Sequence, residues 1–297
     1  MFSRKNTCFI FFGRKEILKV IAAKNRKNKL AVKEFFIEKI SKEAAEEKAF
    51  RAEHVSDRLR ILKNKSQEKI NRVIAVLPEE SSSSKFFQMP VLSRSETRDY
   101  LDVEAERMTE YRLTEAMVDY SVINKDAKKI NLHLAAVKKE TIKSYRKILW
   151  RTYNCYHEIT LRADVIWPLI NELARRENII LLEVYHDKVF LSAGGNNEIY
   201  FYFSRTRNKR KEKEPEFFVK EADEYFRQEI GREPPRKVYV RILDENFMET
   251  PQLSGGHRWC EIPFSRFQFA KDKMTSEFLN LNSPHLLAAV GGIYREL

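Results

Sequence analysis

Short apolar runs and amphipathic stretches alternate along this chain, as is typical of a protein built from both strands and helices. Three apolar runs separated by polar turns predict strands over Cys8–Phe12, Ile17–Ala23 and Leu30–Ile37. From Ser41 to about Leu62, apolar residues recur every three or four positions, and this spacing predicts a helix with one buried side. The β-branched run Val73–Leu77 then predicts a buried strand. The opening segment is therefore expected to form a small α/β unit.

The chain after this strand is predicted to carry an inserted α/β segment. The tract Glu79–Lys85 contains four consecutive serines and is interpreted as a loop or a hairpin tip. Ser93 and Glu96 have the spacing of a capping box, which predicts a helix that ends near Met108. Two strands and a further helix are predicted beyond it, at Ala116–Ile123, Ile130–Val137 and Lys139–Trp150.

The second part of the chain repeats the order of strands followed by helices. A strand and a helix initiated at Pro168 are predicted between Ile159 and Arg176. Three hairpin strands, an amphipathic helix and another strand are predicted at Ile179–Tyr185, Lys188–Ala193, Glu198–Arg205, Pro215–Ile230 and Lys237–Leu243. A short strand near Cys260 and a helix from about Ser283 complete the pattern.

This repetition predicts a duplicated α/β fold with an insertion in its first half. The first half is predicted to span residues 1–176, with the inserted α/β subdomain at about 79–150. The second half is predicted to span residues 177–297, with a small helical and hairpin subdomain at about 205–236. A chain of 297 residues is long enough for two such units, each with its own core.

Composition and charge narrow the class of protein. The apolar stretches, such as Cys8–Phe12 and Ile179–Leu182, are far shorter than the ~18 to 20 residues of a membrane span. No signal-peptide pattern is present, and the three widely spaced cysteines favour a reducing compartment over a disulfide framework. These features predict a cytosolic protein. Its net charge of +12 would attract nucleic acid, an anionic membrane surface or an acidic protein.

Several local runs, in order along the chain, resemble the PilM-type pilus-assembly proteins, which are cytoplasmic actin-like components of type IV pilus and type II secretion machines. The runs that carry the resemblance are Val73–Pro78, Met89–Glu96, Val103–Arg107, Ala116–Ile123, Ile130–Glu140, Phe226–Val240, Glu261–Phe264 and Leu287–Gly292. The resemblance implies an actin-like, ribonuclease H-like duplicated fold. It also implies a cytoplasmic scaffold at the inner face of the inner membrane.

The positions that hold nucleotide in active actin-like proteins differ in this chain. The first phosphate turn should be Asp-x-Gly, but Phe11 stands where the Asp belongs, before Gly13, Arg14 and Lys15. The second turn, which begins at Glu183, has Tyr185 in place of glycine. The chain has only eight glycines. An adenosine-side pair is expected directly after Val238–Val240, but Arg241–Glu245 contains no glycine and the pair Gly255–Gly256 comes too late in the chain. The resemblance therefore implies a scaffold without ATP hydrolysis, although ATP with Mg²⁺ at Gly13, Arg14, Lys15 and Glu183 stays an alternative.

The resemblance further implies a partner, the cytoplasmic N-terminal tail of a PilN-type inner-membrane protein. This tail is expected in the groove between the first subdomain and its insert, because an extended peptide can add to strand edges. The expected lining residues are Met89, Leu92, Leu101, Met108 and Tyr153. Self-association into a ring and contact of the basic run Arg205–Lys213 with an anionic membrane are further expectations.

Two other classes of function stay open at this point. A nucleic-acid-binding protein would use Arg205–Lys213 and the N-terminal basic residues, but no nucleic-acid module is recognisable. A zinc site would need the pair Cys155 and His157 to meet the pair His257 and Cys260, although their spacing is unlike a zinc finger. No nucleophile with an adjacent base is visible, so no catalytic residues and no metal site are predicted.

Overall fold

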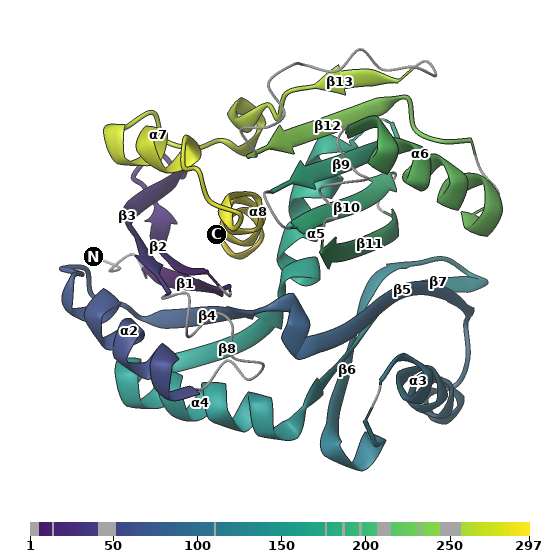
Figure 1. Ribbon diagram of the computed structural model, residues 1–297, viewed down its shortest axis with the longest axis horizontal. Helices are drawn as coiled ribbons and strands as arrows, with labels where there is room; N and C mark the ends of the chain where they lie inside the picture. The colour runs from purple at the N-terminus through teal and green to yellow at the C-terminus, as the bar shows by residue number, and fades with distance from the viewer. Residues whose placement is uncertain are drawn as a thin grey trace.

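The computed structural model describes residues 6–13, 15–40, 52–109, 111–175, 177–185, 188–195, 198–206, 215–230, 233–243 and 257–297. Two five-stranded sheets dominate it (Figure 1). The first has the order β3 (Leu30–Lys39), β2 (Glu16–Lys24), β1 (Thr7–Phe12), β4 (Arg72–Leu77), β8 (Tyr156–Leu161). The second has the order β11 (Glu198–Thr206), β10 (Lys188–Gly195), β9 (Ile179–Val184), β12 (Lys237–Ile242), β13 (Arg258–Cys260).

The two sheets share one topology. In each, the first three strands along the chain pair antiparallel, and two later strands then add in parallel. Identical strand order and direction confirm the predicted duplicated α/β fold. The central strands β1 and β9 are buried along their whole length, and all their residues except Thr7 and Glu183 are apolar because both faces of these strands are covered.

Two helices pack against each other between the sheets (Figure 1). They are α5 (Arg162–Leu173) and α8 (Leu286–Glu296), and their contact includes Gly291. A Cβ at Gly291 would lie 2.1 Å from the backbone oxygen of Val165, so only glycine lets the two helices approach this closely. This helix pair therefore fixes how the two halves are placed.

Other helices cover the outer faces of the sheets. α2 (Ala52–Asn64) and α4 (Lys139–Tyr153) pack on the first sheet, and α6 (Pro215–Tyr225) packs on the second and continues as a π-helical turn, Phe226–Ile230. α7 (Lys273–Leu279), which the sequence pattern did not predict, begins at its cap Asp272 and contacts β3. None of the described helices has the length and apolar character to cross a membrane.

The insert is a three-stranded antiparallel sheet with one helix. Its strand order is β5 (Ser82–Pro90), β7 (Lys129–Lys138), β6 (Ala116–Lys125), and α3 (Arg94–Met108) covers one face. The predicted capping box is present, since the Ser93 side chain accepts from Glu96 N and the Glu96 carboxylate accepts from Ser93 N. Short 3₁₀ turns at Glu79–Ser81 and Leu113–Glu115 lead into β5 and β6.

Two local predictions are wrong. The serine tract is not a loop, because Ser82, Ser83 and Ser84 lie in β5 and Ser81 ends the preceding 3₁₀ turn. Ser82 pairs with Val137, and the backbone ladder with β7 forms without side-chain burial. The helix after β8 begins at Arg162, so Pro168 lies inside it and does not initiate it. The apolar residues Val165, Ile166, Leu169 and Ile170 around this proline are all buried, and their packing offsets the hydrogen bond that proline removes.

Candidate functional site

The first predicted phosphate turn, between β1 and β2, is filled by a histidine. Gly13 N donates to Glu16 O at 3.0 Å, and a Cβ at Gly13 would lie 2.6 Å from His285 Nε2. The imidazole of His285 stacks on Phe11, with 6.1 Å between ring centroids. Burial, and then the charges of Arg162 and Lys188, lower the pKa of His285 to about 3, so this ring is neutral. Lys15 is exposed on the turn, and Arg14 lies outside the described residues.

Glu183 forms a buried ion pair with a residue from the other half. Arg162, the first residue of α5, donates from Nη2 to both Glu183 carboxylate oxygens at 2.8 Å. The exposed fractions of these side chains are 3% and 1%. Tyr185 donates its hydroxyl to Glu183 at 2.5 Å, and burial followed by the charge of Glu183 raises the pKa of this tyrosine. Both carboxylate oxygens of Glu183 are thus paired.

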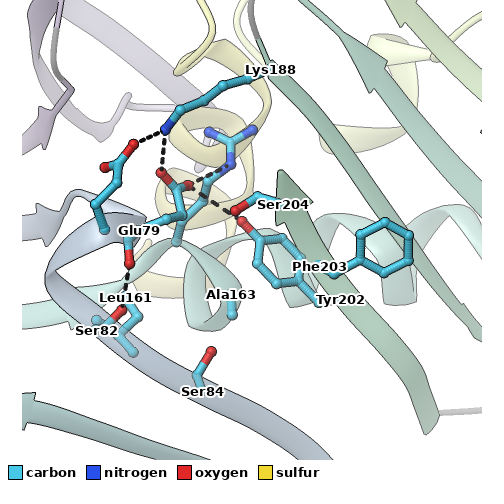
Figure 2. A pocket seen from close by; sticks show the side chains of 11 residues that line it. Glu79, Ser82, Ser84, Leu161, Ala163, Lys188, Tyr202, Phe203 and Ser204 are labelled. Atoms are coloured by element: carbon cyan, nitrogen blue, oxygen red, sulfur yellow. Dashed lines mark hydrogen bonds and ion pairs between the residues drawn. The ribbon is translucent and has the colours of Figure 1, made fainter. Parts of the chain in front are cut away.

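A cavity of about 350 Å³ opens beside this pair, between the insert and the second sheet (Figure 2). Lys188 on β10 pairs there with Glu79 at 3.8 Å and with Glu80. The Tyr202 hydroxyl donates to Glu79 at 3.4 Å, and Figure 2 shows this tyrosine and Lys188 converging on Glu79 from the second half. The charged lining residues are two cations, Arg162 and Lys188, and two carboxylates, Glu79 and Glu80. Both cations are already ion-paired.

A second cavity, of about 590 Å³, lies between the insert and the first half. Residues 119–123 of β6 and 158–161 of β8 line it consecutively. Because neighbouring residues of a strand point to opposite faces, consecutive lining means that the strand edge itself borders the cavity. β6 pairs only with β7, and β8 pairs only with β4, so each presents one unpaired edge within the described sheets. We call this cavity the edge groove.

The five predicted partner-binding residues lie away from this groove. Met89 and Leu101 are buried in the core of the insert, and Leu92 and Met108 pack against the same cluster. Tyr153 packs in the core between the first sheet and α4, with Lys19 Nζ 5.9 Å from its ring centroid. Four of these side chains therefore lie together in the core between α3 and the insert sheet, on the face of that sheet opposite the groove. Contact of any of them with a partner stays a prediction.

The groove side chains that sequence reasoning missed follow the alternation of β6 and β7. Met117, Asp119 and Ser121 are two residues apart on β6, and Ser121 pairs with His133 of β7. This period of two was a usable signal, because it places these side chains on one face of the strand. Nothing in the sequence showed that α5 would bring Asp164 to the same face.

Within the described ranges, no group of three or more His, Cys, Asp or Glu side chains could hold a metal ion. His257, which the zinc alternative would use as a ligand, is hydrogen-bonded to the Asp223 carboxylate at 2.8 Å and to the Pro235 carbonyl at 3.0 Å. The residues 207–213 of the basic run and the pair Gly255–Gly256 lie outside the described residues.

Comparisons with known proteins agree with this architecture. A family model described as type IV pilus assembly protein PilM matches residues 11–166. The structure is similar to that of a PilM-PilN type IV pilus biogenesis complex, with a TM-score of 0.75, 15% identity and 99% coverage of both chains. No curated protein matches the sequence significantly.

More distant structures share the fold. The cytoplasmic domain of EpsL, an inner-membrane component of the type II secretion system of Vibrio cholerae, matches with a TM-score of 0.56, 8% identity and coverage of 99% of this chain and 97% of that one. A Bacteroides thetaiotaomicron protein with an actin-like ATPase fold matches with a TM-score of 0.51, 10% identity and coverage of 81% and 82%. The fold is therefore actin-like. Because the family model covers more than half of its residues, the chain belongs to the PilM family of type IV pilus assembly proteins.

Proposed function

We propose that this protein is a scaffold of a type IV pilus or type II secretion assembly platform, and that it holds the extended cytoplasmic tail of a PilN-type membrane protein in the edge groove. The observation that carries the proposal is the pair of open strand edges, β6 from the insert and β8 from the first half, that border one cavity. The similar solved complex of PilM with PilN supports this choice of partner.

The groove has the features that bind an extended peptide. Unpaired backbone N–H and C=O groups on a strand edge can add one more strand, which supplies affinity that does not depend on sequence. Apolar side chains such as Met117, Ile159 and Trp167 line the same cavity and provide places for alternate side chains of the tail. A peptide bound there would join the insert to the first half.

A binding measurement with matched methionine variants tests the proposal. Met117 on β6 and Met274 on α7 are similarly exposed, at 39% and 37%, but only Met117 lines the groove. A fluorescein-labelled peptide of the source organism's PilN-type N-terminal tail is titrated with each protein, and polarisation is read. We expect Met117→Glu to weaken binding at least tenfold, since it replaces ~1.5 to 3 kcal/mol of apolar burial by a charge. Met274→Glu serves as the control with unchanged affinity.

Failure of the tail to bind the unmodified protein would refute the proposal. Equal losses in the two variants would refute the location, because a charge on α7 does not reach the groove.

We further propose that the protein does not hydrolyse ATP. The residues around the cleft between the two halves do not fit a nucleoside triphosphate. His285 fills the space over Gly13, and the ring of Tyr185 occupies the second turn. Arg162 is bound to Glu183, and the phosphates would meet the carboxylates of Glu79 and Glu80. A turnover assay with Mg²⁺ and ATP is expected to give the rate of buffer alone. A rate above buffer that Glu183→Gln abolishes would overturn this statement.

We place the protein in the cytoplasm at the inner face of the inner membrane, where a tail of the partner would be reachable. The net charge of +12 supports this place, because each basic residue near an anionic surface contributes about 1 kcal/mol. Ring formation stays a prediction, to be checked by the mass of the complex in solution.

A further inference from the structure

A histidine and an aspartate meet inside the edge groove. His133 on β7 is 1% exposed, and its Nδ1 lies 2.6 Å from Oδ1 of Asp164 on the first turn of α5. The ring of Phe86, from the neighbouring strand β5, stacks on the imidazole with 4.3 Å between centroids and 15° between planes. The imidazole is thus held by packing, and it in turn holds the carboxylate.

The carboxylate of Asp164 receives hydrogen bonds from every side of the groove. Ser121 on β6 donates to Oδ1 at 3.4 Å, and Thr160 on β8 donates to Oδ2 at 3.3 Å. Burial acts to raise the pKa of Asp164, but the hydrogen bond and charge of His133, followed by the charge of Arg295, outweigh it and lower this pKa. Asp164 is therefore an ionised acceptor at a point where both open strands and α5 converge.

Two of the side-chain hydrogen bonds to Asp164 are long. An ionised carboxylate only accepts, so His133 donates from Nδ1 in the short bond of 2.6 Å. The bonds from Ser121 and Thr160 are 3.4 and 3.3 Å, and the backbone of Leu161 is a further partner. A charged donor from a bound peptide would replace a long bond by a shorter, charge-assisted one.

The charge of the groove points to a cation as that donor. Glu158 is neutralised by Arg72 at 2.5 Å, and Arg295 lies 3.2 Å from Glu296. Asp119 is exposed and, among the described residues, accepts only from the backbone of Tyr120. Asp119 and Asp164 therefore leave the groove acidic in a protein whose net charge is +12.

We propose that Asp164, oriented by His133, determines the specificity of the edge groove by binding a basic side chain, Lys or Arg, of the extended tail. This inference rests on the proposed function, because it assumes that a peptide enters the groove. Hydrogen bonds between an ion pair are roughly twice as strong as neutral ones, so one such contact would fix the register of a peptide whose backbone alone carries no sequence information.

A double-mutant cycle between protein and peptide tests the proposal. The tail peptide and versions with each Arg replaced by citrulline or each Lys by norleucine are titrated against the unmodified protein and Asp164→Asn. We expect one neutral replacement to weaken binding to the unmodified protein at least tenfold, and to change binding to Asp164→Asn by less than twofold. Asp102→Asn removes an exposed acid on α3 and should keep the full tenfold discrimination.

The possible outcomes distinguish this proposal from the proposed function on which it rests. A tail that does not bind the unmodified protein refutes the groove as its site. A tail that binds equally well with every basic side chain neutralised, or that contains none, refutes the role of Asp164 alone. A uniform loss for all peptides in Asp164→Asn shows a structural role and also refutes it. If circular dichroism shows that Asp164→Asn does not fold, the peptide series is compared between the unmodified protein and Thr160→Val, which removes one hydrogen bond to Asp164. Failure of both proteins to discriminate against the neutral peptides would then refute the role of Asp164.

Discussion

Replacing Arg162 by methionine should destabilise the protein strongly, because the substitution leaves the Glu183 carboxylate buried without its cation. Arg162 donates to both oxygens of Glu183 at 2.8 Å and to the Pro284 carbonyl at 2.9 Å, and its guanidinium lies 4.2 Å from the Phe190 ring centroid. Breaking a buried pair from one side costs about 3 to 5 kcal/mol. We expect Arg162→Met to lower the free energy of unfolding by this amount.

Urea denaturation followed by circular dichroism measures the loss. Arg60→Met is the matched control, since Arg60 and its partner Asp57 are 66% and 78% exposed and their pair should be worth about 0.2 to 1 kcal/mol. The double variant Arg162→Met with Glu183→Leu removes both charges, and replacing a buried pair by apolar side chains is often close to neutral. The double variant should therefore be more stable than Arg162→Met alone. A single variant that loses less than about 1 kcal/mol, or a double variant as unstable as the sum of its parts, would refute the reasoning.

Two further predictions concern the contact between the halves. The pKa of His285 is lowered to about 3 in the folded protein, so only the unfolded chain takes up a proton there as the pH falls below ~6.5. This difference lowers the free energy of unfolding by up to about 1.4 kcal/mol per pH unit. Urea titrations at pH 7, 6 and 5 should therefore show a smaller loss of stability in His285→Phe than in the unmodified protein, and equal losses would contradict the assignment. Gly291→Ala should lower the free energy of unfolding by about 1 to 3 kcal/mol, because its Cβ would meet the Val165 carbonyl at 2.1 Å. Gly292→Ala, whose Cβ would be 3.5 Å from the Phe9 ring, should change it by less than about 1 kcal/mol, and similar melting temperatures for the two variants would refute this packing argument.

The sequence pattern predicts strands that are buried on both faces and fails where pairing is not local. β1 and β9 are apolar except for Thr7 and Glu183, and they are buried along their whole length. The serines of β5 have no such signal, because their strand is defined by backbone pairing with β7, about fifty residues later in the chain. Helix α5 was misjudged because Pro168 is a local signal, whereas the packing that outweighs it comes from both sheets.

The candidate site was predictable in outline and not in its residues. Order along the chain indicated an insert, and the resemblance to PilM-type proteins implied a groove beside it. The apolar residues chosen to line that groove, Met89 and Leu101, have the helical or alternating spacing that a buried core also has, and here they form the core of the insert. Arg162 and Glu183 are 21 residues apart in different halves, and His133 and Asp164 are 31 apart on different elements, so no spacing rule pairs them.

The first turn of α5 links the two sites of this protein. Residues two positions apart on a helix project about 200° apart around its axis, so Arg162 and Asp164 leave the same turn in nearly opposite directions. Arg162 reaches the second half through Glu183, while Asp164 faces the insert through His133. The ion pair that occupies the cleft between the halves therefore also fixes the helix end that borders the edge groove.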